Sequence, residues 1–412
     1  MNTKQASADE LMALEEQYGA NNYHPLPVVL DSGEGVYVRD VNGKRYYDFL
    51  SAYSAVNQGH CHPAIIRAMT EQIQKLTLTS RAFYNSQLGK YEAYVTRYFG
   101  YDKVLPMNTG AEAVETAVKL CRKWAYEKKG IADGEAQIVV CENNFHGRTT
   151  TVVSFSTDPE ARNHFGPYTP GFIAVPYNDA DALAKVFDGH KNIAGFLVEP
   201  IQGEAGVFVP DDGYLKACAA LCRTHRALFI ADEVQTGIAR TGRLLACDYE
   251  DVHPDILILG KALSGGTYPV SAVLSSREIM DVLRPGQHGS TFGGNPVAAA
   301  VAVEALEVVR NERLTENAFR LGNIFREEMQ AYCARSTVAV AVRGKGLLNA
   351  LLINNAEKKD LAWDVCLRLS DNGLLAKPTH TNIIRFAPPL VITEAQLREC
   401  IDIIKTTIAA FE

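Results

Sequence analysis

The sequence predicts an α/β fold, with a large domain built on a mostly parallel central sheet flanked by helices and a smaller α+β domain after it. The first observation is a set of short apolar runs, typical of parallel strands covered on both faces. These runs span residues 136–141, 193–198, 227–231 and 256–259. The second is a change of pattern near residue 311. We expect an N-terminal segment 1–48 that packs with the small domain, a large domain over 49–310 and a small domain over 311–412.

The bulk composition fits an ordinary globular protein. Hydrophobic residues make up 47% and charged residues 22% of the 412 positions. The formal net charge of −7 gives no general attraction to nucleic acid or to anionic membranes, so we expect neither as a partner. No apolar run approaches the roughly 18 residues of a membrane span.

The cysteines and the N-terminus favour a cytoplasmic location. The nine cysteines are odd in number, scattered and without a Cys-x-x-Cys pair, which fits a reducing compartment better than a disulfide framework. His60-Cys61-His62 has no second cluster at zinc spacing, so no metal site is expected. The first residues are acidic and lack the apolar core of a signal peptide.

Local patterns predict the first elements. Residues 7–18 open with a capping box and form a helix. Alternation around an Asn-Gly turn predicts a hairpin over 36–48. The stretch 49–62 is rich in small and polar residues and is expected to be a loop over a ligand site, with Tyr53 as the candidate contact, although a packed turn would show the same pattern. A helix over 63–76 follows.

Two segments have the character of phosphate sites. A strand at 104–107 leads through the small-residue turn 108–113 into a helix, and the free N–H groups at a helix start suit a phosphate. The glycine-rich loop 288–296 has the same character and precedes an alanine-rich helix. Each signal is weak alone.

Two charged residues at strand ends predict the active site. Asp232 follows the run 227–231, and Lys261 follows the run 256–259. In open α/β sheets, ligands bind at that edge. A buried carboxylate and a buried amine need a reason to be there, because unpaired buried charge is costly. A core Asp–Lys ion pair is one reason. Pyridoxal phosphate is another, since a lysine binds its aldehyde and an aspartate keeps its pyridine nitrogen protonated.

The residues around these charges carry a family signature. Asp232-Glu233-Val234-Gln235-Thr236-Gly237 and Gly260-Lys261-Ala262-Leu263-Ser264-Gly265-Gly266 resemble the motif of the class III (omega-amino-acid) aminotransferases of fold type I. The resemblance covers nearly the whole chain and implies a pyridoxal 5'-phosphate enzyme that is a homodimer with shared active sites. Within the class, five further segments resemble the ornithine–oxo-acid aminotransferases. These are residues 22–27, 54–60, 79–85, 343–350 and 372–380.

The resemblance implies a role for each site residue. Lys261 would be the catalytic Schiff-base lysine, and Asp232 the partner of the pyridine nitrogen. The other cofactor contacts would be Gly110, Ala111, Phe145, Val234, Gln235 and, on the glycine-rich loop, Ser290 and the other subunit's Thr291. The substrate contacts would be Tyr23, Tyr53, Arg148 and a switchable Glu204–Arg385 ion pair.

The residue types alone leave several of these roles open. Phe145 could be a core side chain, Arg148 a surface arginine, and Tyr23 an aromatic that merely packs beside prolines. Arg385 lies between apolar neighbours and needs an anion, which either a glutamate or a substrate carboxylate would supply. One position departs from the resemblance: some ornithine enzymes carry tryptophan where this chain has His146.

The expected reaction follows from the resemblance. It is transfer of the δ-amino group of L-ornithine to 2-oxoglutarate, giving glutamate 5-semialdehyde, which cyclises to pyrroline-5-carboxylate, and glutamate. The alternatives are a class III enzyme acting on N-acetylornithine or 4-aminobutyrate, or a non-catalytic protein of the same fold that binds a ligand.

Overall fold

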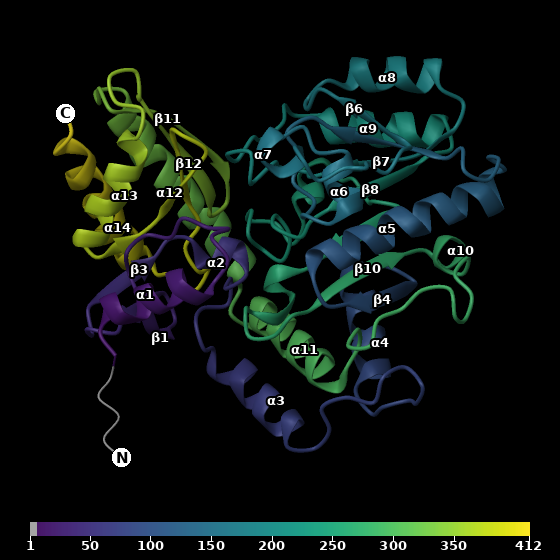
Figure 1. Cartoon of the computed structure of the whole chain (residues 1–412), viewed down its shortest axis with the longest axis horizontal. Coiled ribbons are helices and arrows are strands. Elements are labelled where there is room, and N and C mark those ends of the chain that lie inside the picture. Colours follow the sequence, from purple (N-terminus) through teal and green to yellow (C-terminus); the bar gives the residue numbers. More distant parts are fainter. Residues whose placement is uncertain (1–5) are drawn as a thin grey trace.

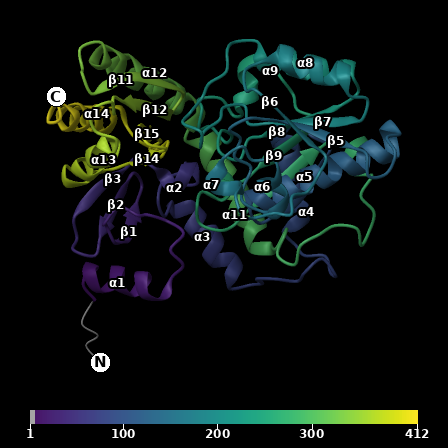
Figure 2. The ribbon, with the colours of Figure 1, turned by 45° about the horizontal axis from the view of Figure 1, so that its top comes forward.

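The computed structural model describes residues 6–412, which form a large and a small body (Figure 1). The large body holds a central sheet with helices on both faces. The small body brings the two ends of the chain together, with the N-terminal strands beside the C-terminal helices α13 (Leu361–Asp371) and α14 (Glu394–Ala409) (Figures 1 and 2). The predicted α/β class is confirmed.

The central sheet has seven strands in the order β4-β10-β9-β8-β7-β5-β6. They are β4 (Lys103–Met107), β5 (Gln137–Cys141), β6 (Phe172–Val175), β7 (Ile193–Val198), β8 (Leu228–Asp232), β9 (Ile256–Leu259) and β10 (Ser271–Ser275). β10 runs antiparallel to both neighbours, β4 and β9, whereas the pairs from β9 to β6 are all parallel. β10 is therefore the single reversed strand of this sheet, and the prediction of a mostly parallel sheet is correct.

Helices cover both faces of this sheet. They are α3 (Pro63–Ile73), α4 (Leu88–Phe99), α5 (Gly110–Trp124), α6 (Thr150–Ser154), α7 (Pro159–Arg162), α8 (Ala180–Gly189), α9 (Tyr214–Thr224), α10 (Arg277–Met280) and α11 (Pro296–Asn311). Val140 and Ile230 pack with α5, whereas the next residues along the strands, Cys141 and Ala231, pack with α8 and α9. This alternation is that of strands buried on both faces. Figure 2 shows α8 and α9 on one side of the sheet and α5 on the other.

The small body contains two four-stranded sheets. One, in the order β11-β12-β15-β14, is antiparallel, and the other has the order β1-β2-β3-β13. The strands are β1 (Leu30–Glu34), β2 (Tyr37–Asp40), β3 (Arg45–Asp48), β11 (Ala339–Lys345), β12 (Leu348–Ile353), β13 (Leu374–Leu375), β14 (Lys377–Thr379) and β15 (Ile383–Phe386). Because β13 pairs in parallel with β3, the N-terminal segment shares a sheet with the C-terminal part. The boundaries at residues 48 and 310 stay a prediction.

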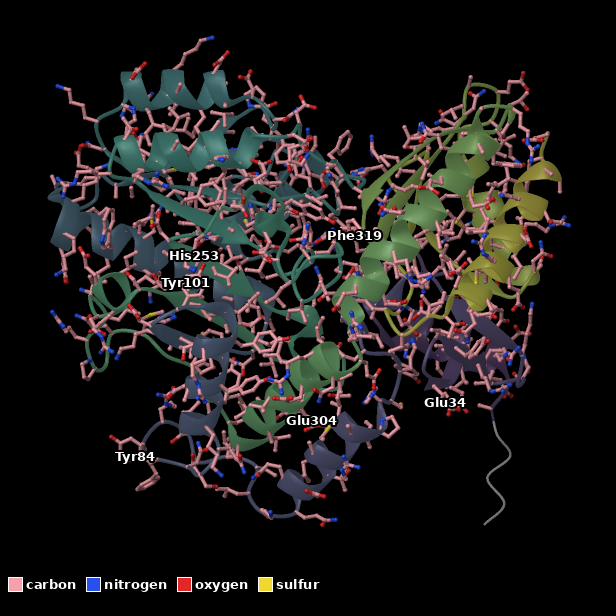
Figure 3. The ribbon with its side chains drawn as sticks, turned by 180° about the vertical axis from the view of Figure 1, so that it is seen from behind. Glu34, Tyr84, Tyr101, His253, Glu304 and Phe319 are labelled. Atoms are coloured by element: carbon pink, nitrogen blue, oxygen red, sulfur yellow. The ribbon has the colours of Figure 1, made fainter. Side chains whose placement is uncertain are left out.

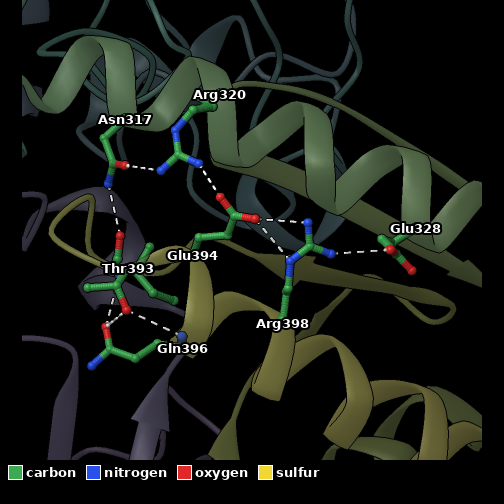
Figure 4. A network of polar contacts seen from close by, with 8 residues as sticks. Asn317, Arg320, Glu328, Thr393, Glu394, Gln396 and Arg398 are labelled. Carbon is green, nitrogen blue, oxygen red and sulfur yellow. Dashed lines mark hydrogen bonds and ion pairs between the residues drawn. The ribbon is translucent and has the colours of Figure 1, made fainter.

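An ion-pair network joins α12 (Leu314–Cys333) to α14 on the surface of the small body (Figure 4). Glu394 contacts both Arg320 and Arg398, and Arg398 also contacts Glu328. Exposed ion pairs of this kind contribute little to stability. The apolar core beneath the helices holds them together instead.

Some local predictions are correct and others fail. The helix that begins after Ser7 is α1 (Ala8–Tyr18), with the expected capping box, and the predicted hairpin is β2 and β3. The patterns did not indicate α4, α8, α13, β1, β6 or β11. Within residues 6–412, no helix is both long and apolar enough to cross a membrane.

Candidate active site

A cavity of about 200 Å³ lies at the carboxyl edge of the central sheet. Its walls come from the start of α5, the segment after β5, and the segments after β7, β8 and β9. Eight of the predicted site residues line it: Gly110, Ala111, Phe145, Glu204, Asp232, Val234, Gln235 and Lys261. Gly110 and Lys261 both line the cavity although 151 positions separate them in the sequence. The strand order of the sheet brings the segments that carry them to the same edge.

Asp232 is the last residue of β8 and is only 6% exposed. Its Oδ1 accepts a hydrogen bond from the backbone N–H of Val234 at 3.0 Å, and its Oδ2 lies 2.7 Å from Nδ1 of the buried His146. Burial alone would lower the pKa of His146, but the hydrogen bond and the charge of Asp232, together with the charge of Glu199, outweigh it and the pKa is raised. Asp232 is thus held in place by two contacts.

Lys261 follows β9 on a short turn, with a left-handed φ of +43°. Burial lowers the pKa of its amine, and the carboxylates of Asp232 and Glu204 oppose this shift only partly. The amine is buried, as expected, although the residue as a whole is only partly buried because it borders the cavity. Asp232 pairs with His146 instead of Lys261, so the simple core ion pair is not the reason for these charges within the described residues.

The cavity offers a close fit for a flat, phosphorylated ring. The start of α5 is fixed by the capping box of Thr109 and Glu112. A Cβ added to Gly110 would lie 3.0 Å from Val234, so only a small residue fits there. Two buried polar atoms at the cavity, Oε1 of Gln235 and Nε2 of His146, have no hydrogen-bond partner among the residues that the structure describes. Such orphan atoms call for a polar ligand, and pyridoxal phosphate supplies phosphate, hydroxyl and ring-nitrogen groups.

Arg385 forms the predicted ion pair with Glu204. The guanidinium is on β15, is 2% exposed, and donates from Nη1 to Glu204 Oε2 at 2.8 Å. Burial raises the pKa of Glu204, but the charge and hydrogen bond of Arg385, together with the charges of Lys261 and His380, more than offset this, so the pKa of Glu204 lies below the ordinary value. The anion that Arg385 needs is thus a glutamate of the same chain in this state. Tyr53 lies beside the pair, with its ring centre 5.2 Å from the guanidinium carbon.

Tyr53 lies on an unusual turn within the segment 49–62, for which a loop over a ligand site or a packed turn was expected. Four consecutive residues of α2 (Ser51–Ser54) have φ between +47° and +72°. None is a glycine, and the left-handed conformation costs roughly 1–2 kcal/mol for each residue with a side chain. Strain of this size persists only where neighbouring contacts impose it.

The other predicted residues do not line the cavity. Tyr23 is 67% exposed, and Thr291 is also exposed. Arg148 is exposed, with its guanidinium carbon 5.9 Å from the centre of the Phe145 ring at the cavity wall. Ser290 accepts a hydrogen bond from Nδ2 of Asn108, near the start of α5, at 2.8 Å. The roles of these four residues stay predictions.

Two residues of the site were missed by the sequence reasoning. His146 was treated only as a departure from a resemblance, yet it contacts Asp232. Glu199 follows β7, is buried, and accepts the backbone N–H of Phe145 at 2.9 Å; burial raises its pKa to about 8. Their positions in the sequence could have indicated both residues, because each follows a buried strand and so lies at the sheet edge where Asp232 lies.

Comparison with known proteins places the chain in a family. Residues 18–408 match the family Aminotransferase class-III, so the chain belongs to it. The protein is a pyridoxal-phosphate-dependent aminotransferase, and this enzyme class replaces the non-catalytic alternative.

Three similar proteins bear the names of particular enzymes of this class. "Ornithine aminotransferase, mitochondrial" of Drosophila melanogaster is 61% identical, over 98% of this chain and 92% of the relative. The crystal structure of the ornithine aminotransferase from Toxoplasma gondii is 48% identical with a TM-score of 0.97, covering 99% of this chain and 96% of that one. The structure of acetylornithine aminotransferase from Elizabethkingia anophelis is 62% identical with a TM-score of 0.91, covering 98% and 100%.

Proposed function

We propose that this enzyme is an ornithine aminotransferase. It moves the δ-amino group of L-ornithine to 2-oxoglutarate and produces glutamate 5-semialdehyde, which cyclises to pyrroline-5-carboxylate, and glutamate. The observation that supports the proposal is the Glu204–Arg385 ion pair beside Lys261. An ion pair that can open and close allows one site to accept two unlike substrates. The names of the Drosophila melanogaster and Toxoplasma gondii relatives support the same substrate.

The protein's side chains handle the protons of the reaction. When bound, pyridoxal phosphate supplies a carbonyl that accepts the amino group and a ring that withdraws electrons. The lowered pKa of Lys261 leaves more of its amine neutral, so it can take a proton from the substrate carbon that bears the amine. Asp232, fixed by His146, presents a carboxylate that would hold a proton on the ring nitrogen of the bound cofactor. Phe145 and Val234, on the cavity wall, would enclose the ring.

The ion pair selects between the two substrates. Ornithine carries no carboxylate next to the carbon that reacts, whereas glutamate does. With Glu204 bound to Arg385, the guanidinium is neutralised and δ-amine chemistry is favoured. When Glu204 moves away, Arg385 binds the α-carboxylate of glutamate in the second half of the reaction. Tyr23 and Arg148 hold the distant α-amino and α-carboxylate groups of ornithine.

N-acetylornithine is a second candidate substrate, because the Elizabethkingia anophelis relative bears that name at 62% identity. The experiment compares L-ornithine, N-acetylornithine and 4-aminobutyrate, each with 2-oxoglutarate, by kcat/KM. We expect ornithine to lead by about tenfold or more, since a polar site rejects an analogue that leaves its groups unpaired. Preference for N-acetylornithine would leave Lys261 and Asp232 in their roles but withdraw those of Tyr23 and Arg148.

We further propose a homodimer with shared active sites. Ser290 and Thr291 do not line the cavity of their own chain, and the exposed side of this loop at Thr291 can reach the phosphate in a second copy. Three large aromatic side chains are exposed. Phe292 follows Thr291 in the glycine-rich loop, and Phe83 and Tyr84 lie on the connection between α3 and α4. Tyr84 is fully exposed and directed away from the body (Figure 3). Such a surface is typical of an interface.

Mixing two defective variants tests the shared site. Lys261→Ala removes the amine, and Thr291→Asp places a negative charge where the partner's phosphate is expected. Each alone should be nearly inactive. After subunit exchange, a mixed dimer has one site with both parent residues, so roughly a quarter of all sites should recover. No recovery in exchanged mixtures would show that each site is built from one chain.

We also keep a cytoplasmic location as a proposal. The nine cysteines are all free thiols, which suits a reducing compartment. The Drosophila melanogaster relative is named mitochondrial, so cell fractionation is the test.

A further inference from the structure

Asp48 makes three contacts at the entrance of the strained turn. It is the last residue of β3 and is 8% exposed. Its Oδ1 accepts the backbone N–H groups of Leu50 at 2.8 Å and Ser51 at 2.9 Å. Its Oδ2 lies 2.7 Å from Nε2 of His60, which fixes the orientation of the carboxylate. Oδ1 therefore fixes the N–H groups of Leu50, just before the turn, and of Ser51, the first residue of the turn.

The left-handed turn begins where these hydrogen bonds end. Residues with side chains avoid this conformation, so four in a row need an external constraint. The far end is closed by the N–H of Ala55, which donates to the carbonyl of Ser51 at 2.8 Å. The base is tied to the small body, because the carbonyl of Phe49 accepts the N–H of Ala387 at 2.7 Å, two residues after Arg385.

This arrangement links Asp48 to the substrate switch. The turn presents the Tyr53 ring over the Arg385 guanidinium, at 5.2 Å, beside the Glu204 carboxylate. We propose that Asp48 is a positioning residue: by fixing the left-handed turn, it holds Tyr53 over the Arg385–Glu204 pair and so sets the preference between ornithine and glutamate. The inference rests on the proposed function, because the preference concerns those two substrates.

The chain contains a matched control for this contact pattern. Asp40, at the end of β2, accepts the N–H groups of Asn42 and Lys44 through Oδ1, both at 2.9 Å. Its Oδ2 accepts the hydroxyl of Tyr46 at 2.8 Å. Asp40 thus makes the same number of contacts as Asp48, two of them to backbone N–H groups, but in a hairpin that does not carry Tyr53. Its third partner is a hydroxyl instead of an imidazole. Replacing either aspartate leaves two N–H groups without their acceptor.

The experiment compares Asp48→Ala and Asp40→Ala as holoenzymes. The readouts are Tm and the ratio of kcat/KM for ornithine to kcat/KM for glutamate, each in its half-reaction. Both variants should lose thermal stability. We expect Asp48→Ala to change the ratio by about tenfold or more, since small displacements at a site have effects of this size, and Asp40→Ala to leave it within about twofold. Equal ratios in the two variants would overturn the positioning role.

A second pair of variants covers the case in which Asp48→Ala does not fold. Ala52 is exposed and has a φ of +47°, and its side chain is a methyl group with no polar atom to lose. Ala52→Gly suits that φ and should keep the parent ratio. Ala52→Val disfavours it, because its side chain is branched, and should change the ratio as Asp48→Ala does. A parent ratio in Ala52→Val would contradict the proposal.

The two proposals fail in different ways. If the parent enzyme does not turn over ornithine, the proposed function fails. The glutamate half-reaction still reports the contact of Tyr53 with Arg385, so its KM then serves as the readout. A changed glutamate KM in Asp48→Ala but not in Asp40→Ala would support the positioning role even then, and an unchanged KM would end it. Asp48→Asn, which keeps an acceptor oxygen, should restore most of the parent value.

Discussion

Replacing Lys261 with alanine is expected to abolish transamination and to remove the visible absorbance that bound pyridoxal phosphate gives the protein. Among residues 6–412, Lys261 is the one lysine that lines the cavity, and its lowered pKa makes its amine available as a base. Loss of general acid–base catalysis alone accounts for about 10² to 10⁴ in rate, and loss of the covalent attachment adds to it. Stopped-flow kinetics and the absorption spectrum measure both effects.

Lys129→Ala is the matched control. Lys129 is also partly buried, with a pKa lowered by burial, and its Nζ donates to the carbonyls of Ile193 and His225 at 2.6 and 2.8 Å. Its loss should lower Tm while the absorbance and turnover remain. An absorbing, active Lys261→Ala variant would contradict the assignment of the catalytic amine.

Replacing Glu204 with alanine is expected to shift the enzyme from ornithine toward glutamate. The variant leaves Arg385 buried and without its anion, so a substrate carboxylate becomes the best available partner. A hydrogen bond to a charged group contributes about 1.5–3 kcal/mol, so the ratio of kcat/KM for the two half-reactions should change by about 10- to 100-fold. Ornithine should also begin to react at its α-amine.

Two controls define this effect. Glu204→Gln keeps an acceptor oxygen without the charge and should give an intermediate ratio. Glu394→Ala removes an ion-paired glutamate from the α12–α14 network of Figure 4, far from the cavity lining, and should leave the ratio unchanged. If Glu204→Ala keeps the parent selectivity between the two amines of ornithine, the ion pair does not act as a switch.

The strands that build the site could be predicted because their sequences are simple. β7, β8 and β9 are buried throughout, so each is a continuous apolar run, and the charged residue after such a run marks the sheet edge. The pairing of Glu204 with Arg385 could be predicted only from the family resemblance. From residue types alone, Arg385 needed an anion but did not reveal which one.

The turn that carries Tyr53 had no sequence signal. In a sequence, glycine or asparagine usually indicates left-handed backbone. The turn contains neither, since it consists of Ser51, Ala52, Tyr53 and Ser54. The conformation is imposed from outside, by contacts such as those of Asp48. The contact between His146 and Asp232 was hidden for a related reason: 86 positions separate the two residues, and β7 lies between the strands that present them.

The most direct test of the central claim follows the nitrogen atom. The holoenzyme is incubated with 2-oxoglutarate and L-ornithine labelled with ¹⁵N at either the δ- or the α-amine, and the glutamate formed is analysed by mass spectrometry. We predict that δ-labelled ornithine gives ¹⁵N-glutamate together with pyrroline-5-carboxylate, and that α-labelled ornithine gives unlabelled glutamate. Label in glutamate from the α-amine, or none from the δ-amine, would contradict the proposed function.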